Sequence, residues 1–195
     1  MNNYEENNNY LTKEEIKTLL ITASKVDDLI YNFTLISLST GMRRGETLGL
    51  SWDNIDIDKK LIYVVQKLTY SPGQGLQLKK IPVKYQRKLY IDSKEVLNAL
   101  KKIYIEQKQL KYLLKDKYNN KNNLVFCDDH GKSYHPSAVT KKFNDIIIIA
   151  ALNKNISIHS LRKTYANLLF QEDINLQTIK DKLGISILNE SYITE

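Results

Sequence analysis

The chain has few of the residues that hold disulfides and metals. Its 195 residues include one cysteine and three histidines, so no internal disulfide can form and a reducing compartment is the natural one. Cys127 follows the apolar run 124–126 and is expected to pack in the core. His130 and His135 flank Gly131 but belong to no cluster of His and Cys. Because zinc sites use such clusters, we expect no metal site.

Long apolar runs are also missing. No apolar stretch reaches the roughly 20 residues that cross a bilayer, and the polar, Asn-rich beginning does not resemble a signal peptide. We therefore expect a cytoplasmic protein without membrane contact. What the chain does have is a hydrophobic fraction of 42%, enough for the core of one sizeable domain. It also has 29 Lys and Arg against 22 Asp and Glu, a net charge of +7, which favours a polyanionic partner.

Hydrophobic periodicity predicts a mainly helical α+β domain. Thr12 and Glu15 form a capping-box pattern that starts the first helix. Apolar residues then recur at helical spacing in further segments, and we expect helices near 12–23, 28–39, 45–52, 93–115, 136–150, 158–171 and 175–183. Three runs with strand character, 55–57, 61–67 and 87–91, predict a small three-stranded antiparallel sheet, with Pro72–Gly75 in its second connection.

One stretch that could carry chemistry is Ile158–Tyr165, which contains an H-x-L-R pattern. His159 and Arg162 are three residues apart, so on a helix they lie on the same face. Together they can bind a phosphate, because Arg offers a planar fork of donors and His a directed donor. For an isolated pattern of this kind, a solvated face of a core helix is the more common explanation.

A second stretch, Thr40–Glu46, has the pattern T-G-x-R-x-x-E at the end of an apolar helix. Alone, it could be an exposed basic elbow that begins at a helix-ending glycine, Gly41. Together and in this order, however, the two patterns resemble the tyrosine recombinases, the phage and transposon integrase family. The resemblance runs from about Leu11 to Gly184 and covers nearly the whole chain.

The resemblance implies an activity and a set of site residues. Relatives cut and rejoin DNA through a covalent 3′-phosphotyrosyl link, with no metal and no high-energy cofactor. Two arginines and a histidine hold the phosphate, and a lysine on the hairpin between the second and third strands protonates the departing 5′ oxygen. Lys84 is favoured over Lys80 for that lysine. The implied residues are Arg43, Lys84, His159, Arg162 and Tyr192 for catalysis, Glu46 in support of the first arginine, and Arg44, Lys80, Arg87 and Lys163 as DNA contacts.

The tail departs from the family pattern. Ile185 stands where relatives usually have a histidine, and Tyr192 follows it at a shorter spacing than theirs. Lys163 likewise stands where many relatives have a second histidine. Divergence, a disrupted reading frame and residues missing from the sequence all fit this pattern. Tyr192 is the only tyrosine after the last expected helix, so it is the candidate nucleophile.

For the chain as a whole, the resemblance predicts a flexible leader over 1–10 and an integrase catalytic domain over 11–195, without the N-terminal DNA-binding domains that integrases usually carry. The expected partner is double-stranded DNA at a recombination site, with self-assembly on DNA and a monomer in isolation. Two other functions stay open: a degenerate relative that binds DNA without cutting it, and a helical DNA- or RNA-binding module with no catalytic ancestry. Type IB topoisomerases share the chemistry but lack the T-G-x-R-x-x-E pattern.

Overall fold

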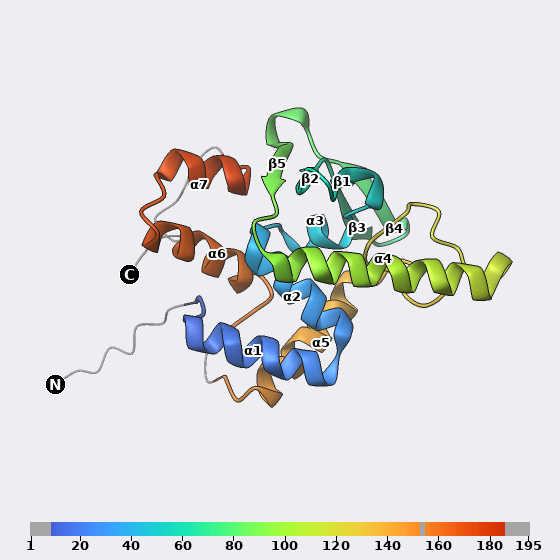
Figure 1. Ribbon diagram of the computed structural model, residues 1–195, viewed down its shortest axis with the longest axis horizontal. Helices are drawn as coiled ribbons and strands as arrows, with labels where there is room; N and C mark the ends of the chain where they lie inside the picture. The colour runs from blue at the N-terminus through green and yellow to red at the C-terminus, as the bar shows by residue number, and fades with distance from the viewer. Residues whose placement is uncertain (1–8, 153–154, 186–195) are drawn as a thin grey trace.

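The computed structural model describes residues 9–152 and 155–185. As predicted, the described chain is mainly helical, with small antiparallel sheets on one side (Figure 1). Its α-helices are α1 (Lys13–Val26), α2 (Asp28–Thr40), α3 (Arg44–Leu48), α4 (Lys94–Leu114), α5 (Pro136–Ile149), α6 (Ser160–Gln171) and α7 (Leu176–Leu183). The predicted capping box at Thr12 and Glu15 is present and begins α1. No helix in these ranges is long and apolar enough to span a membrane.

The predicted three-stranded antiparallel sheet is confirmed. It consists of β1 (Ile55–Asp56), β2 (Leu61–Val64) and β5 (Arg87–Tyr90), with β2 in the middle. In this register Ile62 lies opposite Leu89 and Val64 lies opposite Arg87. Buried and half-buried residues alternate along β2, so one face of the sheet packs on the core. This register places Arg87 at the inner end of its strand.

A second sheet was not predicted. The expected strand 61–67 stops after Val64, and a separate hairpin follows, formed by β3 (Gln66–Ser71) and β4 (Gly75–Lys80). Gly73 and Gly75 adopt positive φ in its turn, which glycine tolerates without steric cost. Within the two strands only Leu68 is buried. Leu68 and Tyr70 on β3, and Leu76 and Leu78 on β4, do alternate with polar residues, but most of the hairpin stays outside the core.

The expected helix 45–52 is also shorter than predicted. It ends at Leu48, and a 3-10 turn, η1 (Trp52–Asn54), follows. Ser51 between them forms a β-bridge with Leu124, and this pairing draws the backbone out of the helical path. Cys127, which was expected in the core, is half-buried.

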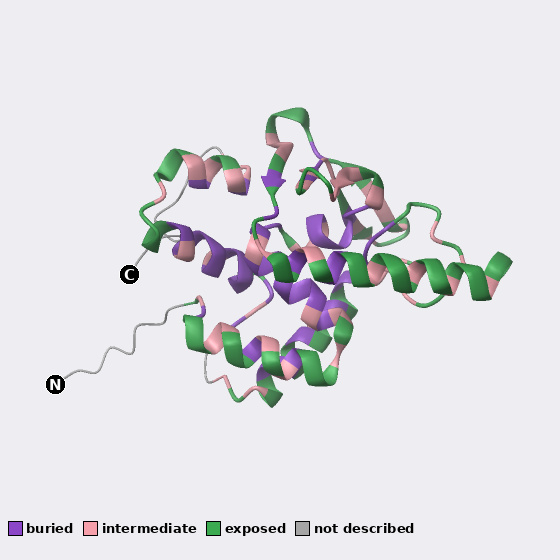
Figure 2. Ribbon diagram, in the orientation of Figure 1, coloured by how far each residue is buried: buried purple, intermediate pink, exposed green. Residues whose placement is uncertain are grey.

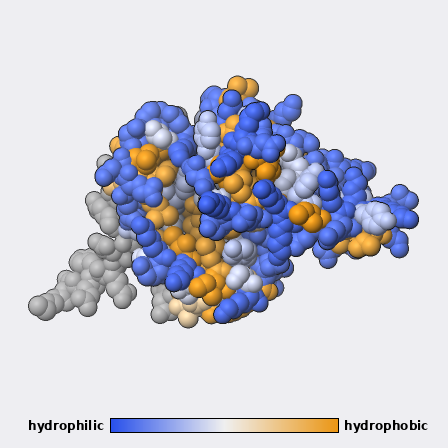
Figure 3. All heavy atoms as spheres, in the orientation of Figure 1, coloured by the Kyte–Doolittle hydropathy of each residue, from blue (hydrophilic) through white to orange (hydrophobic). Residues whose placement is uncertain are grey.

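The core is organised around α2. Figure 2 shows α2 and α6 largely buried, whereas the outer end of α4 is exposed. A small separate apolar cluster lies between α6 and α7 and includes Tyr165, Leu169, Ile179 and Leu183. The outer half of α4 projects from the body and presents mostly hydrophilic residues (Figure 3). α6 packs on α2 as well as on α7, and the contacts of this pair with α2 and β5 decide where the C-terminal part of the described chain lies.

Candidate active site

The turn after α2 brings three helices together. Gly41 ends α2 in the left-handed conformation, with φ of 62°, and its N–H donates to Ser37 O at 2.9 Å. A Cβ at this position would overlap the ring of Tyr165 on α6 and come within 2.9 Å of Leu183 on α7. Glycine is therefore required both by the backbone conformation and by the close packing of the three helices.

Arg43 and Glu46 form a fixed pair at the start of α3. The backbone N–H of Arg43 donates to Glu46 Oε2 at 2.9 Å, and its Nη1 donates to Glu46 Oε1 at 3.2 Å. The Arg43 side chain is 45% exposed, whereas that of Glu46 is 3% exposed. A buried carboxylate therefore holds a partly exposed guanidinium in place, and the supporting role of Glu46 in catalysis stays a prediction.

The charge of Glu46 is stabilised in spite of its burial. Desolvation alone would raise the pKa of this carboxyl, but the hydrogen bond and the charge of Arg87, followed by the contacts with Arg43, hold its pKa below the ordinary value of 4.5. Glu46 is therefore an anion at neutral pH, bracketed by two arginines.

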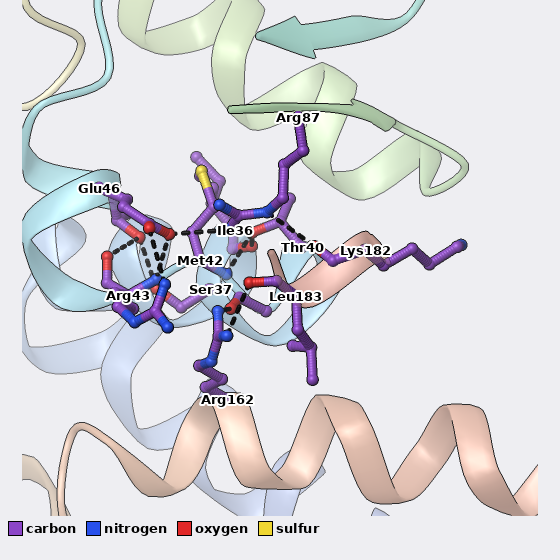
Figure 4. A network of polar contacts seen from close by, with 12 residues as sticks. Ile36, Ser37, Thr40, Met42, Arg43, Glu46, Arg87, Arg162, Lys182 and Leu183 are labelled. Atoms are coloured by element: carbon purple, nitrogen blue, oxygen red, sulfur yellow. Dashed lines mark hydrogen bonds and ion pairs between the residues drawn. The ribbon is translucent and has the colours of Figure 1, made fainter. Parts of the chain in front are cut away.

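Arg162 connects the two sequence patterns directly. It lies on the first turn of α6 and is 6% exposed. Its Nη1 donates to Gly41 O at 2.8 Å, across 121 residues of sequence, and its Nη2 donates to Leu183 O at 2.7 Å. Figure 4 shows Arg162 beneath the turn that leads to Arg43. The structure thus brings the two sequence patterns together at Gly41, and the Arg162 side chain lies in the interior and not on an open surface.

His159 and Arg44 lie on the exposed side of the same region. His159 precedes α6, and its ring makes no capping hydrogen bond. Partial desolvation, and then the positive charge of Arg44, lower the pKa of His159, so the ring is neutral at neutral pH. Arg44 Nη1 donates to Thr140 Oγ1 on α5 at 2.7 Å. A neutral imidazole that is not used to cap the helix can exchange a proton with a bound group.

The two candidate lysines lie at different places on one connection. Lys80 ends β4 and pairs with Gln66, whose side-chain Nε2 donates to Gly49 O at 2.8 Å, just after α3. Lys84 lies in the 3-10 turn η2 (Val83–Tyr85), with its Nζ 4.9 Å from the centre of the Tyr85 ring. Both are exposed, and Lys80 is on the hairpin that packs beside α3. Lys84 and Lys80 therefore stay alternative predictions for the proton donor.

The hairpin also carries two lysines that the sequence prediction did not include. Lys67 and Lys79 are exposed and lie directly opposite each other on β3 and β4. A glycine-containing turn between two short strand-like runs could have indicated this hairpin. With Lys80, these side chains make the hairpin a basic element next to α3.

Arg87, which was predicted as a DNA contact, has its side chain in the interior. Its side chain is 5% exposed, and its Nη2 forms an ion pair with Glu46 Oε2 at 2.7 Å. Its Nε donates to Lys182 O at 2.7 Å. The physical reason is the register of β5, which turns this residue inward toward α3 and α7. Lys163, by contrast, is half-exposed on α6.

Tyr192, the predicted nucleophile, lies outside the described residues. Within 9–152 and 155–185, no group of three or more His, Cys, Asp or Glu side chains could hold a metal ion. A hollow of about 1070 Å³ lies elsewhere, between α4, the β1–β2 hairpin and the loop 118–123, and none of Arg43, His159 and Arg162 lines it. The candidate residues Arg43, His159 and Arg162 lie instead on the α2–α3 turn and at the start of α6.

Comparison with curated proteins finds tyrosine recombinases. Tyrosine recombinase XerC of Pediococcus pentosaceus is 28% identical over 155 residues, which are 79% of this chain and 45% of that protein. Tyrosine recombinase XerH of Helicobacter pylori is 26% identical over 191 residues, 94% of this chain and 47% of that protein. The chain thus spans less than half the length of these relatives.

Solved structures share the fold. The integrase of the Tn1549 transposon, in complex with a circular intermediate DNA, superposes with a TM-score of 0.82 at 21% identity, covering 100% of this chain and 64% of that one. XerA recombinase gives a TM-score of 0.70 at 22% identity, covering 94% and 61%. The model of the phage integrase family matches residues 9–190, including both patterns that meet at Gly41. The chain therefore belongs to the phage integrase family, the tyrosine recombinases.

Proposed function

We propose that this chain acts in site-specific DNA recombination, by cutting and rejoining DNA strands during the integration or excision of a mobile element. The observation that carries the proposal is the hydrogen bond from Arg162 Nη1 to Gly41 O at 2.8 Å. It joins the start of α6, which carries H-x-L-R, to the α2–α3 turn, which carries T-G-x-R-x-x-E. The family resemblance implies that these two motifs form one site. The relatives named above, recombinases and a transposon integrase, support the same activity.

In the proposed reaction, Arg43, His159 and Arg162 surround one phosphodiester. Negative charge grows on its non-bridging oxygens as it is attacked, and preorganised donors there lower the barrier. Tyr192 gives up its hydroxyl proton to solvent as its oxygen bonds to phosphorus, and the bond from phosphorus to the 5′ oxygen breaks. Lys84 or Lys80 gives a proton to that oxygen. The 3′-phosphotyrosyl link is then attacked by a 5′ hydroxyl, which restores the DNA backbone and the tyrosine.

Double-stranded DNA is the proposed partner. The net charge of +7 favours phosphate contacts, and Arg44, Lys80 and Lys163 are exposed or half-exposed residues that could make them. Solved structures with this fold include XerH bound to its difH substrate and a lambda integrase tetramer bound to a Holliday junction. We propose accordingly that the free chain is a monomer and that copies assemble on DNA.

The test is covalent trapping. The protein is incubated with nicked duplexes that carry the ends of the genetic element encoding it, and adducts that survive detergent are separated on a gel. We expect an adduct with the parent and none with Tyr192→Phe. Tyr112→Phe is the matched control, because Tyr112 is an 80% exposed tyrosine on α4. An adduct that persists in Tyr192→Phe would exclude Tyr192 as the nucleophile.

A second function, DNA binding without cleavage, is favoured by two observations. Both Nη atoms of Arg162 donate to backbone carbonyls, and Ile185 replaces the usual histidine after α7. A site whose second arginine supports the fold could keep its affinity for DNA after losing catalysis. The same experiment distinguishes the two functions, since this one gives a complex on native gels and no adduct with any duplex.

A further inference from the structure

The C-terminus of α7 is capped by backbone N–H groups and by two arginine side chains. An α-helix leaves its last four carbonyl groups without partners inside the helix. In α7 the first two of these are satisfied by the backbone, because Gly184 N–H donates to Asp181 O and Ile185 N–H donates to Lys180 O, each at 3.2 Å. Gly184 has a φ of 64°, as expected for a glycine that ends a helix. Two carbonyls, at positions 182 and 183, then remain.

Two arginines from other elements take these last carbonyls. Arg87 on β5 donates its Nε–H to Lys182 O, and Arg162 on α6 donates an Nη2–H to Leu183 O, both at 2.7 Å. Positive side chains at this end also interact favourably with the helix dipole. The last turn of α7 is thus held from two sides by buried cations (Figure 4).

The other end of Arg87 reaches the candidate active site. Its Nη2 lies 2.7 Å from Glu46 Oε2, and the side chains are 5% and 3% exposed. The same Oε2 accepts the backbone N–H of Arg43 at 2.9 Å. A continuous path of short polar contacts therefore runs from the end of α7 through Arg87 and Glu46 to Arg43.

This path leaves Arg87 little freedom to move. A Cβ at Gly184 would lie 3.1 Å from both Cδ and Nη1 of Arg87, so the guanidinium packs against the glycine that ends α7. Within the described residues Nη1 itself has no hydrogen-bond partner. A buried ion pair adds little net stability when its two desolvation costs are counted. The main consequence of this ion pair is therefore the geometry that it fixes between β5 and α3.

We infer that Arg87 is a positioning residue that locks the end of α7 to the Glu46–Arg43 pair, and so sets where the chain departs toward Tyr192. Arg87 itself contacts neither DNA nor the reacting atoms. The catalytic part of the inference rests on the proposed function, because the position of the end of α7 relative to Arg43 matters for catalysis only if the nucleophile follows α7. The lock itself consists of contacts within the protein and can be measured without DNA.

The first experiment measures amide hydrogen exchange in α7. Arg87→Gln removes the charged guanidinium group. Arg87→Lys keeps a positive charge near Glu46, but its single nitrogen cannot donate to both Glu46 and Lys182 O in the geometry of the guanidinium group. We expect exchange in α7 to rise about ten- to a hundred-fold in both variants. Lys88→Gln is the matched control, because Lys88 is the exposed next residue of the same strand. Should Arg87→Gln fail to fold, Arg87→Lys carries the test. Exchange equal to that of the parent in Arg87→Lys would overturn the lock.

The second experiment follows adduct formation against pH on the nicked duplexes. Without Arg87, Glu46 loses the main cause of its lowered pKa and takes up a proton at higher pH. Adduct formation by Arg87→Gln should therefore begin to fall at a higher pH than that of the parent as the pH is lowered. At neutral pH it should already be slower by on the order of a hundred-fold if the site shifts by about 1 Å. Arg87→Lys should keep the pH profile of the parent.

The two experiments separate the inference from the proposed function. If the parent forms no adduct with any duplex, the proposed function fails, and exchange in α7 alone supports or overturns the lock. If the parent forms adducts and Arg87→Gln forms them equally fast with an unchanged pH profile, the proposed function stands and the positioning role is wrong.

Discussion

At the scale of single residues, Arg162 has a structural task as well as a proposed chemical one. Its guanidinium joins the end of α2 to the end of α7 through two carbonyls. Arginine suits both tasks, because its planar fork can address several acceptors at once, which the ammonium of lysine does less well. The consequence is that substitutions at this position change stability and activity together, and each must be measured.

Arg162→Lys should show both effects. Lysine keeps the charge but cannot serve both Gly41 O and Leu183 O, so we expect a loss of about 1–3 kcal/mol in the free energy of unfolding. Adduct formation should fall on the order of a hundred- to a thousand-fold, with duplex affinity nearly unchanged. Denaturant unfolding, trapping and a binding titration measure the three quantities. Lys101→Ala, an exposed change on α4, is the control, and normal cleavage by Arg162→Lys would show that Arg162 is structural only.

Glu46 gives a prediction about stability and pH. Its folded-state pKa lies below the ordinary value of 4.5, so it contributes stability that is complete above that pH and is lost as the pH falls through the lower folded-state pKa. Glu46→Gln should therefore be less stable than the parent at neutral pH, with a difference that shrinks below about pH 4.5. Urea unfolding at a series of pH values measures this. A difference that stays constant down to acid pH would contradict the proposed charge state of Glu46.

At the scale of elements, the α2–α3 turn depends on Gly41. Gly41→Ala would add the cost of a left-handed residue, roughly 1–2 kcal/mol, to that of overpacking against Tyr165, about 1–3 kcal/mol. Gly73→Ala is the matched control, because Gly73 also has a positive φ but no atom lies within 4 Å of its Cβ position. Urea unfolding of both variants isolates the packing contribution. Equal losses in the two variants would show that Tyr165 moves aside at little cost.

The helices could be predicted from the sequence because their signals are local. The capping box at Thr12 and the glycines that end α2 and α7 act within a few residues. The β3–β4 hairpin was missed since it buries only Leu68. The inward position of Arg87 could not be predicted either, because its partner Glu46 lies 41 residues earlier in the chain. A charged residue on a strand does not reveal whether its partner is solvent, DNA or another part of the protein.

The candidate site could be predicted in part, because the signals of its two motifs are also local in the sequence. The two motifs were found from their residue types and order, and the structure brings them together at Gly41. The choice of Lys84 or Lys80 as the proton-donating lysine could not be made from the sequence. The reason is that the unpredicted hairpin β3–β4 lies in the connection that carries both residues. Its register depends on pairing across the turn at 72–74, which residue spacing alone did not fix.

At the scale of the whole molecule, the net charge of +7 and the burial of particular arginines together determine how DNA affinity depends on salt. Each phosphate contact releases counterions, so the logarithm of the affinity falls linearly with the logarithm of the salt concentration. An exposed lysine that touches a phosphate contributes to this slope. A buried arginine paired with Glu46 does not, although both carry the same charge and both were predicted as DNA contacts.

The salt titration therefore distinguishes the two kinds of cation. Lys80→Ala should weaken duplex binding and reduce the slope by about 1, because Lys80 is exposed beside α3. Arg87→Gln should leave the slope unchanged while it slows adduct formation, since its charge faces the interior. Binding is measured by fluorescence anisotropy from roughly 50 to 200 mM salt, with Lys101→Ala on α4 as the control for a lost surface charge. A slope reduced equally by Arg87→Gln and Lys80→Ala would mean that Arg87 leaves Glu46 to meet a phosphate when DNA binds, and the lock at the end of α7 would then have to open during recombination.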